Sequence, residues 1–258
     1  MQGLIRAVGF VAAVGLLVRR SLRLKQPVTV YADGHCIYIR PTDSDLFVAS
    51  QIFGWREYDI GIKPRKALNS LAAFWRKQGD IPVIVDAGAN VGYSALYLAD
   101  SFPDALVLAV EPDGVTLDAL KRNCAGNERI IPVHAALWSH EKGVSLRSAD
   151  ALGSWARSVE EGGSTPSRRL DLLLADIPRA RVLLIKLDIE GAEREVCSSA
   201  LESIRAAPCI MIEPHDFMFP GAGCLAPLYS AVAGRKMDTL LRGENILLLD
   251  STLADAAL

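Results

Sequence analysis

The sequence lacks the features that mark several classes of protein. Its 28 basic and 30 acidic residues give a net charge of −2 over 258 residues, and this balance gives no reason to expect a nucleic-acid-binding protein, which usually has a basic face. The five cysteines include no C-x-x-C pair, so neither a disulfide framework nor a zinc site is predicted. Reduced thiols are expected instead, which is typical of a cytoplasmic protein.

A long hydrophobic run is also missing. Residues 7–18 carry no charge, but as a helix they would reach only about 18 Å, against a hydrocarbon core of about 30 Å. Four basic residues follow them and no small-residue cleavage site is present, so a secretory signal peptide is not expected. Charge is nevertheless segregated, because residues 1–32 hold five basic and no acidic residues.

Two interpretations of residues 1–25 stay open. The segment would lie as a helix on an anionic membrane surface with its basic residues at the head groups, which would place the protein at the inner membrane surface. Alternatively, it would be a terminal helix packed on the domain. In the first case the side chains expected in lipid are Leu4, Ile5, Val8, Val11 and Leu17.

The sequence then predicts an accessory layer over residues 27–79, after a basic apolar segment over residues 1–26. Two β-rich runs within residues 28–39 surround Asp33 and Gly34, a pair that is a strong signal for a β-hairpin. Apolar residues at close to the helical period follow over residues 46–53 and 67–75. We therefore expect a hairpin and helices ahead of the main domain.

From residue 80 to residue 258 the pattern is that of an α/β core domain. Short apolar runs alternate with helical stretches, which predicts a doubly wound, mostly parallel sheet with an antiparallel C-terminal edge hairpin. A polar segment over residues 139–169 interrupts this alternation and is expected to be irregular, either a mobile surface loop or a lid over the substrate. The predicted strands are 83–85, 106–110, 130–134, 182–187, 209–212, 237–241 and 246–249, and the predicted helices are 93–99, 115–123, 194–206 and 225–233.

The turn after the first core strand is the most informative motif. Gly88 and Gly92 have the spacing G-x-x-x-G, while Asn90 and Tyr93 stand where the dinucleotide fingerprint G-x-G-x-x-G needs glycine. The turn begins with Asp86, whose carboxylate would repel a diphosphate, and no lysine or arginine occurs over residues 78–120. The motif therefore favours a cationic or zwitterionic ligand without phosphate.

An acidic residue ends the second core strand. Glu111 lies 19 residues after Gly92, and Pro112 follows it and ends the strand. In doubly wound folds an acid at this point accepts hydrogen bonds from the ribose hydroxyls of a nucleotide-type ligand. Glu111 is therefore predicted to bind a ribose.

Three stretches together resemble the FkbM family of S-adenosylmethionine-dependent methyltransferases. They are V-D-A-G-A-N-V-G-Y-S over residues 85–94, V-E-P over 110–112 and I-K-L-D-I-E-G-A-E over 185–193, and the resemblance extends over residues 37–250. It implies a Rossmann-like methyltransferase fold that binds S-adenosylmethionine and releases S-adenosylhomocysteine. The donor-binding residues that it and the motifs imply are Asp86, Gly88, Ala89, Asn90, Gly92, Tyr93, Ser94, Glu111, Pro112, Ala135, Ala136, Asp188 and Glu190.

The acceptor side is expected at the ends of the next two strands. Asp188 follows the strand over 182–187, and Glu213 and His215 follow the strand over 209–212. Methyl transfer to a hydroxyl requires alignment of the acceptor and removal of a proton, for which a carboxylate or a histidine is suited. These three residues are the predicted catalytic residues. No dedicated metal-ligand spacing is present, and no metal site is predicted.

The function predicted from the sequence is S-adenosylmethionine-dependent methyl transfer, with O-methylation of a saccharide or another small molecule as the leading hypothesis. An N- or carboxyl-methyltransferase would use the same donor site. An NAD-dependent oxidoreductase or a non-catalytic nucleoside-binding protein is the alternative from another class. The expected partner is a small-molecule or glycan acceptor, with no nucleic acid, and the sequence does not indicate an oligomeric state.

Overall fold

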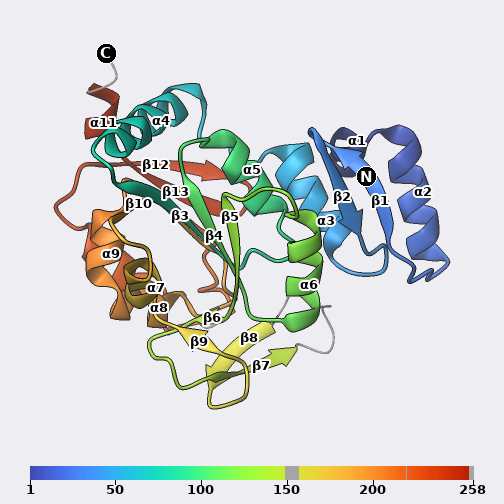
Figure 1. Ribbon diagram of the computed structural model, residues 1–258. Helices are drawn as coiled ribbons and strands as arrows, with labels where there is room; N and C mark the ends of the chain where they lie inside the picture. Colours follow the sequence, from blue (N-terminus) through green and yellow to red (C-terminus); the bar gives the residue numbers. More distant parts are fainter. Residues whose placement is uncertain (149–156, 219, 256–258) are drawn as a thin grey trace.

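A seven-stranded sheet forms the centre of the computed structural model, which describes residues 1–148, 157–218 and 220–255 (Figure 1). The strand order is β12-β13-β11-β10-β3-β4-β5. The strands from β11 to β5 are parallel, whereas β13 pairs antiparallel with β11 and with β12. The strands are β3 (Ile81–Ala87), β4 (Leu106–Glu111), β5 (Ile130–His134), β10 (Ala180–Leu187), β11 (Cys209–Ile212), β12 (Met237–Arg242) and β13 (Asn245–Asp250).

This architecture confirms the expected fold class. The run Val83, Ile84 and Val85 is fully buried, as expected for a parallel strand that is covered on both faces. The edge hairpin turns where Arg242 pairs with Asn245. The ends of each predicted core strand lie within two residues of the observed ones, because uninterrupted apolar runs flanked by turn residues are a strong signal.

Helices cover both faces of the sheet (Figure 1). Side chains of Ile84 and Val107 pack with α4, α5 and α6 on one face, whereas Val83 and Val85 pack with α7 to α10 on the other. The helices are α4 (Ile62–Lys77), α5 (Tyr93–Ser101), α6 (Gly114–Asn123), α7 (Leu170–Ala175), α8 (Glu193–Ser199), α9 (Leu201–Ala206), α10 (Ala226–Val232) and α11 (Thr252–Asp255).

The single helix predicted over residues 194–206 is wrong, because the chain breaks at Ala200 into α8 and α9. The backbone of Ala200 has φ −126° and ψ 38°, outside the helical region. Just before it, the Ser199 hydroxyl donates to the carbonyls of Glu195 and Val196. A serine bonded to its own helix in this way competes with the backbone ladder and favours an ending.

The N-terminal layer packs against the side of the core formed by α5 and α6. The hairpin expected around Asp33 and Gly34 is confirmed. Side chains of the layer, such as Ile37 and Leu46, share one apolar core with α5. Its elements are α1 (Gln2–Val8), α2 (Phe10–Ser21), β1 (Val28–Ala32), β2 (His35–Ile39), α3 (Asp45–Ala49) and a π-helix, η1 (Ser50–Trp55). The division at residue 79 stays a prediction.

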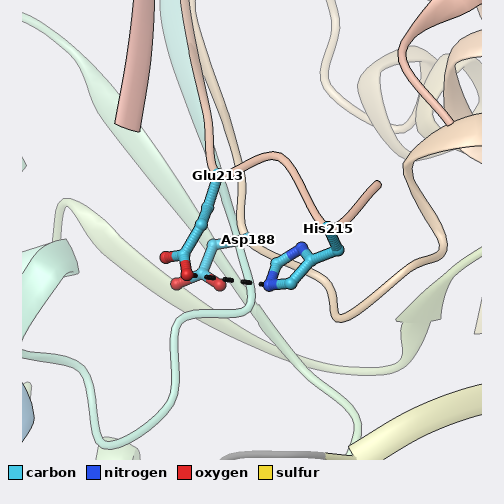
Figure 2. Close-up of side chains that lie close together, drawn as sticks. All are labelled: Asp188, Glu213 and His215. Carbon is cyan, nitrogen blue, oxygen red and sulfur yellow. Dashed lines mark ion pairs between the residues drawn. The ribbon is translucent and has the colours of Figure 1, made fainter. Parts of the chain in front are cut away.

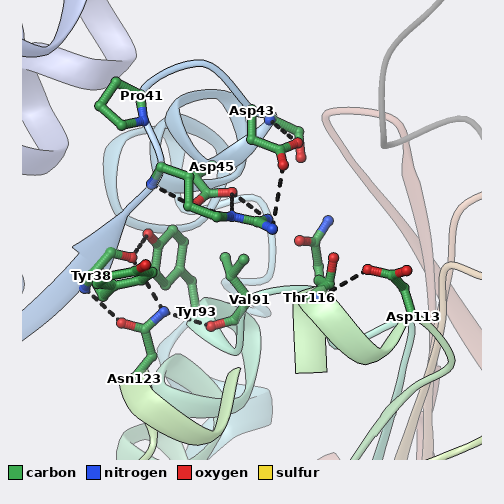
Figure 3. A network of polar contacts seen from close by, with 12 residues as sticks. Tyr38, Pro41, Asp43, Asp45, Val91, Tyr93, Asp113, Thr116 and Asn123 are labelled. Carbon is green, nitrogen blue, oxygen red and sulfur yellow. Dashed lines mark hydrogen bonds and ion pairs between the residues drawn. The ribbon is translucent and has the colours of Figure 1, made fainter. Parts of the chain in front are cut away.

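A polar network fastens this layer to the core (Figure 3). The Asn123 side chain accepts from the Tyr38 amide at 2.6 Å and donates to the Val91 carbonyl at 2.8 Å. The Tyr93 hydroxyl donates to the carbonyl of Tyr38 at 2.7 Å. Two residues of the core, Asn123 and Tyr93, therefore hold the end of β2 in place, close to the turn that follows β3.

Helix α1 packs against η1 of the same layer. A Cβ atom on Gly54 would overlap the carbonyl oxygen of Gly3, so this approach requires glycine. Leu4 is buried, and Ile5, Val8 and Leu17 pack against the core. The prediction that these four face lipid is therefore wrong, and Val11 alone of that set is exposed. No helix in the described part of the chain is both long and apolar enough to span a bilayer.

The segment over residues 139–169 contains strands, so the expectation of an irregular insertion is wrong for its described part. The strands in it are β7 (Val144–Ser148) and β8 (Arg157–Glu161), which pair antiparallel, and β9 (Ser167–Arg168), which pairs parallel with β6 (Ala136–Leu137) just before the segment. The alternating Val144, Ser145, Leu146 is the sequence signal for a strand here. Residues 149–156 lie outside the described residues.

Candidate active site

A cavity of about 560 Å³ lies at the carboxyl ends of the central strands. This is the edge at which doubly wound sheets bind ligands. The core lines most of it, and residues of α2, α3 and η1 complete one side. The lining residues are Arg20, Ser44, Phe47, Val48, Gln51, Gly88, Asn90, Val110, Glu111, Pro112, Thr116, Ala135, Ala136, Leu137, Leu146, Asp188, Ile189, Glu190, Ala192, Glu213 and Glu244.

The turn after β3 and Glu111 form one wall of the cavity, which we call the donor wall. A Cβ on Gly88 would overlap the backbone carbonyl of Asp188, so glycine lets the turns after β3 and β10 meet. Asn90 has φ 48°, a left-handed conformation that asparagine tolerates better than most residues. Its buried Oδ1 has no hydrogen-bond partner among the described residues and can accept a bond from a ligand.

Glu111 ends β4 and is held by backbone amides. Its Oε2 accepts from the Asn90 amide at 3.0 Å, and its Oε1 accepts from the Asp113 amide at 2.9 Å. Burial raises the pKa of Glu111 to about 7, against these amide hydrogen bonds, which lower it. A fixed carboxylate of this kind at the second strand end can accept ribose hydroxyls.

Eight of the predicted donor-binding residues line the cavity and five do not. Those that line it are Gly88, Asn90, Glu111, Pro112, Ala135, Ala136, Asp188 and Glu190, and those behind its wall are Asp86, Ala89, Gly92, Tyr93 and Ser94. The structure gives the latter contacts within the protein, such as the ion pair of Asp86 with Lys186. The Ser94 hydroxyl donates to Asp86 at 2.6 Å, and a Cβ on Gly92 would meet the side chains of Cys124 and Leu120.

Lys186 is a site residue that the sequence interpretation missed. Its side chain is 1% exposed, and its ammonium lies 3.2 Å from Asp86 and 3.4 Å from Asp188 and donates to the Gly88 carbonyl at 2.7 Å. Burial lowers the pKa of this lysine, but the carboxylates, Asp86 foremost, raise it well above its usual value. Lys186 therefore stays charged and ties the turns after β3 and β10 together. A lysine inside an otherwise apolar strand was the available signal.

A second cluster, which we call the acceptor wall, consists of Asp188, Glu190, Glu213 and His215. Figure 2 shows three of them, Asp188, Glu213 and His215, close together. His215 Nε2 lies 3.6 Å from a Glu190 oxygen and 3.7 Å from Glu213 Oε1. Burial and the charge of Asp188 together raise the pKa of Glu190 to about 7, against His215, which lowers it. Burial and the Asp188 charge also raise the pKa of Glu213. The structure thus brings the three predicted catalytic residues together, although His215 itself does not line the cavity.

Glu193 orients His215 and was also missed as a separate site residue. It begins α8, is fully buried, and its Oε1 lies 2.7 Å from His215 Nδ1. Burial lowers the pKa of His215, but the hydrogen bond and charge of Glu193 raise it above its usual value. Glu190 has φ 55°, and such strained non-glycine residues cluster at functional sites. The motif D-I-E-G-A-E was the available signal for Glu193.

The residues present fit S-adenosylmethionine. Glu111 can hold the ribose, the free Asn90 Oδ1 can accept from an ammonium, and Ala135, Ala136 and Leu137 supply an apolar edge for adenine. The carboxylates of the acceptor wall complement a cationic sulfonium.

A seven-stranded doubly wound sheet that carries this pocket at its carboxyl edge defines the Rossmann-like methyltransferase class. The model of the "Methyltransferase FkbM domain" matches residues 86–245. The chain belongs to the FkbM methyltransferase family, which confirms the resemblance seen in the sequence.

Several known proteins are similar to the chain. It is 29% identical over 176 residues to Methyltransferase 1 of Beauveria bassiana, covering 58% of this chain and 65% of that protein. It is 26% identical to the hexuronic acid methyltransferase AglP of Haloferax volcanii, covering 54% of this chain and 58% of that protein. The chain thus matches less than two thirds of either relative. The solved fibrillarin pre-rRNA processing protein of Methanococcus jannaschii matches with 13% identity and a TM-score of 0.42, over 87% of this chain and 81% of that one.

Proposed function

We propose that the protein transfers a methyl group from S-adenosylmethionine to a hydroxyl of a saccharide or another small molecule. One observation carries this proposal: a single cavity is lined by a ribose-type carboxylate, Glu111, and by a group of carboxylates, two of which lie beside the buried His215. AglP, a relative of the chain, is named for methylation of a hexuronic acid, which supports an oxygen-rich acceptor.

The roles of the residues follow from this arrangement. When bound, the donor supplies an electrophilic methyl group on a sulfonium. Glu111 would hold the ribose, and Asn90 would orient the methionine end. The acceptor hydroxyl would lie against Asp188 and Glu213, and the acceptor wall would receive its proton. Lys186 would keep the two walls at a fixed separation, as in-line transfer requires.

Calorimetric titration with S-adenosylhomocysteine and with NAD tests the donor assignment. We expect S-adenosylhomocysteine to bind and NAD to bind far more weakly, since the wall lacks the diphosphate-binding glycines. Tighter binding of NAD would contradict the proposal and favour an oxidoreductase.

Release of S-adenosylhomocysteine with a panel of acceptors tests the reaction. The panel should contain uronic acids, neutral sugars, amines and carboxylic acids that lack a free hydroxyl. Turnover restricted to the hydroxyl-bearing acceptors is the expected result. Turnover restricted to the amines or the carboxylic acids would replace O-methylation by N- or carboxyl-methylation, and binding without turnover of any acceptor would favour a binding protein.

A further inference from the structure

We propose that Asp188, Glu213 and His215 bind a divalent cation beside the donor site. One oxygen or nitrogen atom from each residue lies within 4.8 Å of the other two. Asp188 and Glu213 follow the neighbouring parallel strands β10 and β11, so the fold brings them to the same edge (Figure 2). This departs from the sequence interpretation, which predicts no metal site because the ligands have no characteristic spacing.

The orientation of His215 is the second observation that points to a cation. The side chain is 2% exposed, and Glu193, itself fully buried, lies at its Nδ1. Among the described residues no hydrogen bond reaches Nε2, which faces the carboxylates of Glu190 and Glu213 at 3.6 Å and 3.7 Å. With its proton on Nδ1, the ring directs a lone pair at these carboxylates, and a cation held by His215, Glu213 and Asp188 would satisfy the lone pair and offset the negative charge.

The ligand set indicates which cations fit. Metal-binding histidines almost always donate their other ring N–H to a carboxylate, the role that Glu193 has here. One imidazole with two carboxylates suits first-row divalent ions such as Mn²⁺ better than it suits Ca²⁺. The competing arrangement is an imidazolium whose Nε2–H points at the carboxylates, and the experiment below separates the two.

A role for the cation rests on the proposed function. Coordination would lower the pKa of the acceptor hydroxyl. The hydroxyl proton would pass to a carboxylate of the acceptor wall, the oxygen lone pair would form the new O–CH₃ bond, and the electron pair of the S–CH₃ bond would stay on the sulfur of S-adenosylhomocysteine. An acceptor with neighbouring oxygens, such as a uronic acid, would then be preferred because it can chelate the ion.

Mn²⁺ binding to the full chain tests the site directly. The protein is first stripped of metal with a chelator, and binding is followed by the electron paramagnetic resonance of free Mn²⁺. We expect one ion per chain, loss of binding in His215→Ala, and affinity about 10- to 100-fold lower in Glu193→Gln, which leaves the ligands in place. Glu202→Gln, at an exposed carboxylate of α9, is the matched control. Absence of stoichiometric binding, or equal affinity in all variants, would overturn the site and favour the imidazolium.

The failure of the metal site and the failure of the proposed function are distinguishable. Titration with S-adenosylhomocysteine in the presence of the chelator reports on the donor wall alone. Donor binding together with full turnover in chelator would overturn the cation and leave the methyltransferase. Mn²⁺ binding without donor binding would leave the cation site and overturn the methyltransferase.

The N-terminal helix carries a second, independent inference. We infer that the outer face of α2 docks on an anionic lipid surface. The exposed fractions of Phe10, Val11, Val14, Val18 and Leu22 range from 40% to 84%. At about 100° per residue these five positions lie within an arc of roughly 120°. No charged residue falls within this apolar arc, whereas Ala13 and Leu16 on the opposite side are buried.

The charge of the residues near α2 indicates which kind of surface this face binds. Arg23 and Lys25 follow the helix and are exposed, and no acidic residue occurs before Asp33. A cluster of basic residues beside an apolar helix face is the pattern that binds anionic lipid. Arg20 connects this surface to the active site, because it lines the cavity and donates to the Asp43 carbonyl at 2.7 Å. Docking would therefore bring the cavity close to acceptors at the membrane surface.

Flotation with vesicles of phosphatidylcholine and phosphatidylglycerol tests this inference. The full chain should float with them and not with phosphatidylcholine alone. Val11→Glu combined with Val18→Glu should abolish flotation. Arg23→Ala combined with Lys25→Ala should lower the affinity for the vesicles about 30-fold, at about 1 kcal/mol per basic residue. Ile62→Glu, at an exposed apolar residue of α4, should float like the unmodified chain. Equal recovery of all variants, or a soluble dimer that only the double glutamate variant dissociates, would overturn it.

Discussion

The two walls of the cavity differ in how far the protein satisfies its own polar groups. On the donor wall, Glu111 is held by two backbone amides, and the turn after β3 is fixed by Gly88 and by the charge of Lys186. On the acceptor wall, carboxylates crowd around one nitrogen of His215 without a hydrogen bond to it among the described residues. The donor wall is thus prepared for one ligand, whereas the acceptor wall still needs a proton, a cation or a substrate.

Removal of Lys186 should have the largest effect, because this residue serves both walls. Lys186→Met would leave the fully buried Asp86 without its counter-charge, and breaking a buried pair in this way costs about 3–5 kcal/mol. The expected result is a lower free energy of unfolding in urea. Lys121→Met, at an exposed lysine of α6, is the control, and an equal change in both variants would show that Lys186 does not join the walls.

His215→Ala should show that the two walls have different functions. We expect kcat to fall about 10²-fold or more, the usual contribution of a positioned proton-transfer group, with little change in affinity for S-adenosylhomocysteine. Glu193→Gln should lower kcat less, because it keeps the ring and weakens only its orientation. A parallel loss of donor affinity in both variants would show that the two walls are not independent.

Glu111→Ala, in contrast to His215→Ala, should act mainly on the affinity for S-adenosylhomocysteine. Loss of a charged hydrogen-bond acceptor costs about 1.5–3 kcal/mol, so the Kd for S-adenosylhomocysteine should rise about 10- to 100-fold in calorimetry. Glu128→Ala, at an exposed glutamate before β5, should bind normally. Unchanged affinity in Glu111→Ala would place the ribose elsewhere.

A smaller effect is expected from pH. Because burial raises the pKa of Glu111 to about 7, this carboxyl gains a proton as the pH falls through 7 and loses its charge as an acceptor. Affinity for S-adenosylhomocysteine should therefore decrease several-fold from pH 8 to pH 6, within the range expected for loss of one charged hydrogen bond. In Glu111→Gln the dependence should flatten, and an unchanged pH profile in that variant would assign the titration to another group.

The same comparison shows what the sequence could predict. The strands and the edge at which the site lies were predicted, because the spacing of apolar residues and the residues of turns are local signals. The convergence of Asp188, Glu213 and His215 followed from strand ends that share one edge. The roles of Lys186 and Glu193 were not predicted, since each depends on a partner across the fold.

The remaining differences also have physical causes. Residues of α2, α3 and η1 line the cavity because Tyr38 is hydrogen-bonded to α5 and α6, a tertiary contact with no local signal. Helix α2 also turns a different face outward from the one expected. Hydrophobicity alone did not distinguish the face that packs on the core from the face that stays exposed.

A crystal structure of the complex with S-adenosylhomocysteine tests the central claim most directly. The two-wall arrangement predicts the ribose hydroxyls within hydrogen-bond distance of Glu111 and the sulfur facing Asp188 and Glu213, which line the cavity. A ribose bound away from Glu111, or a sulfur turned from the acceptor wall, would contradict it.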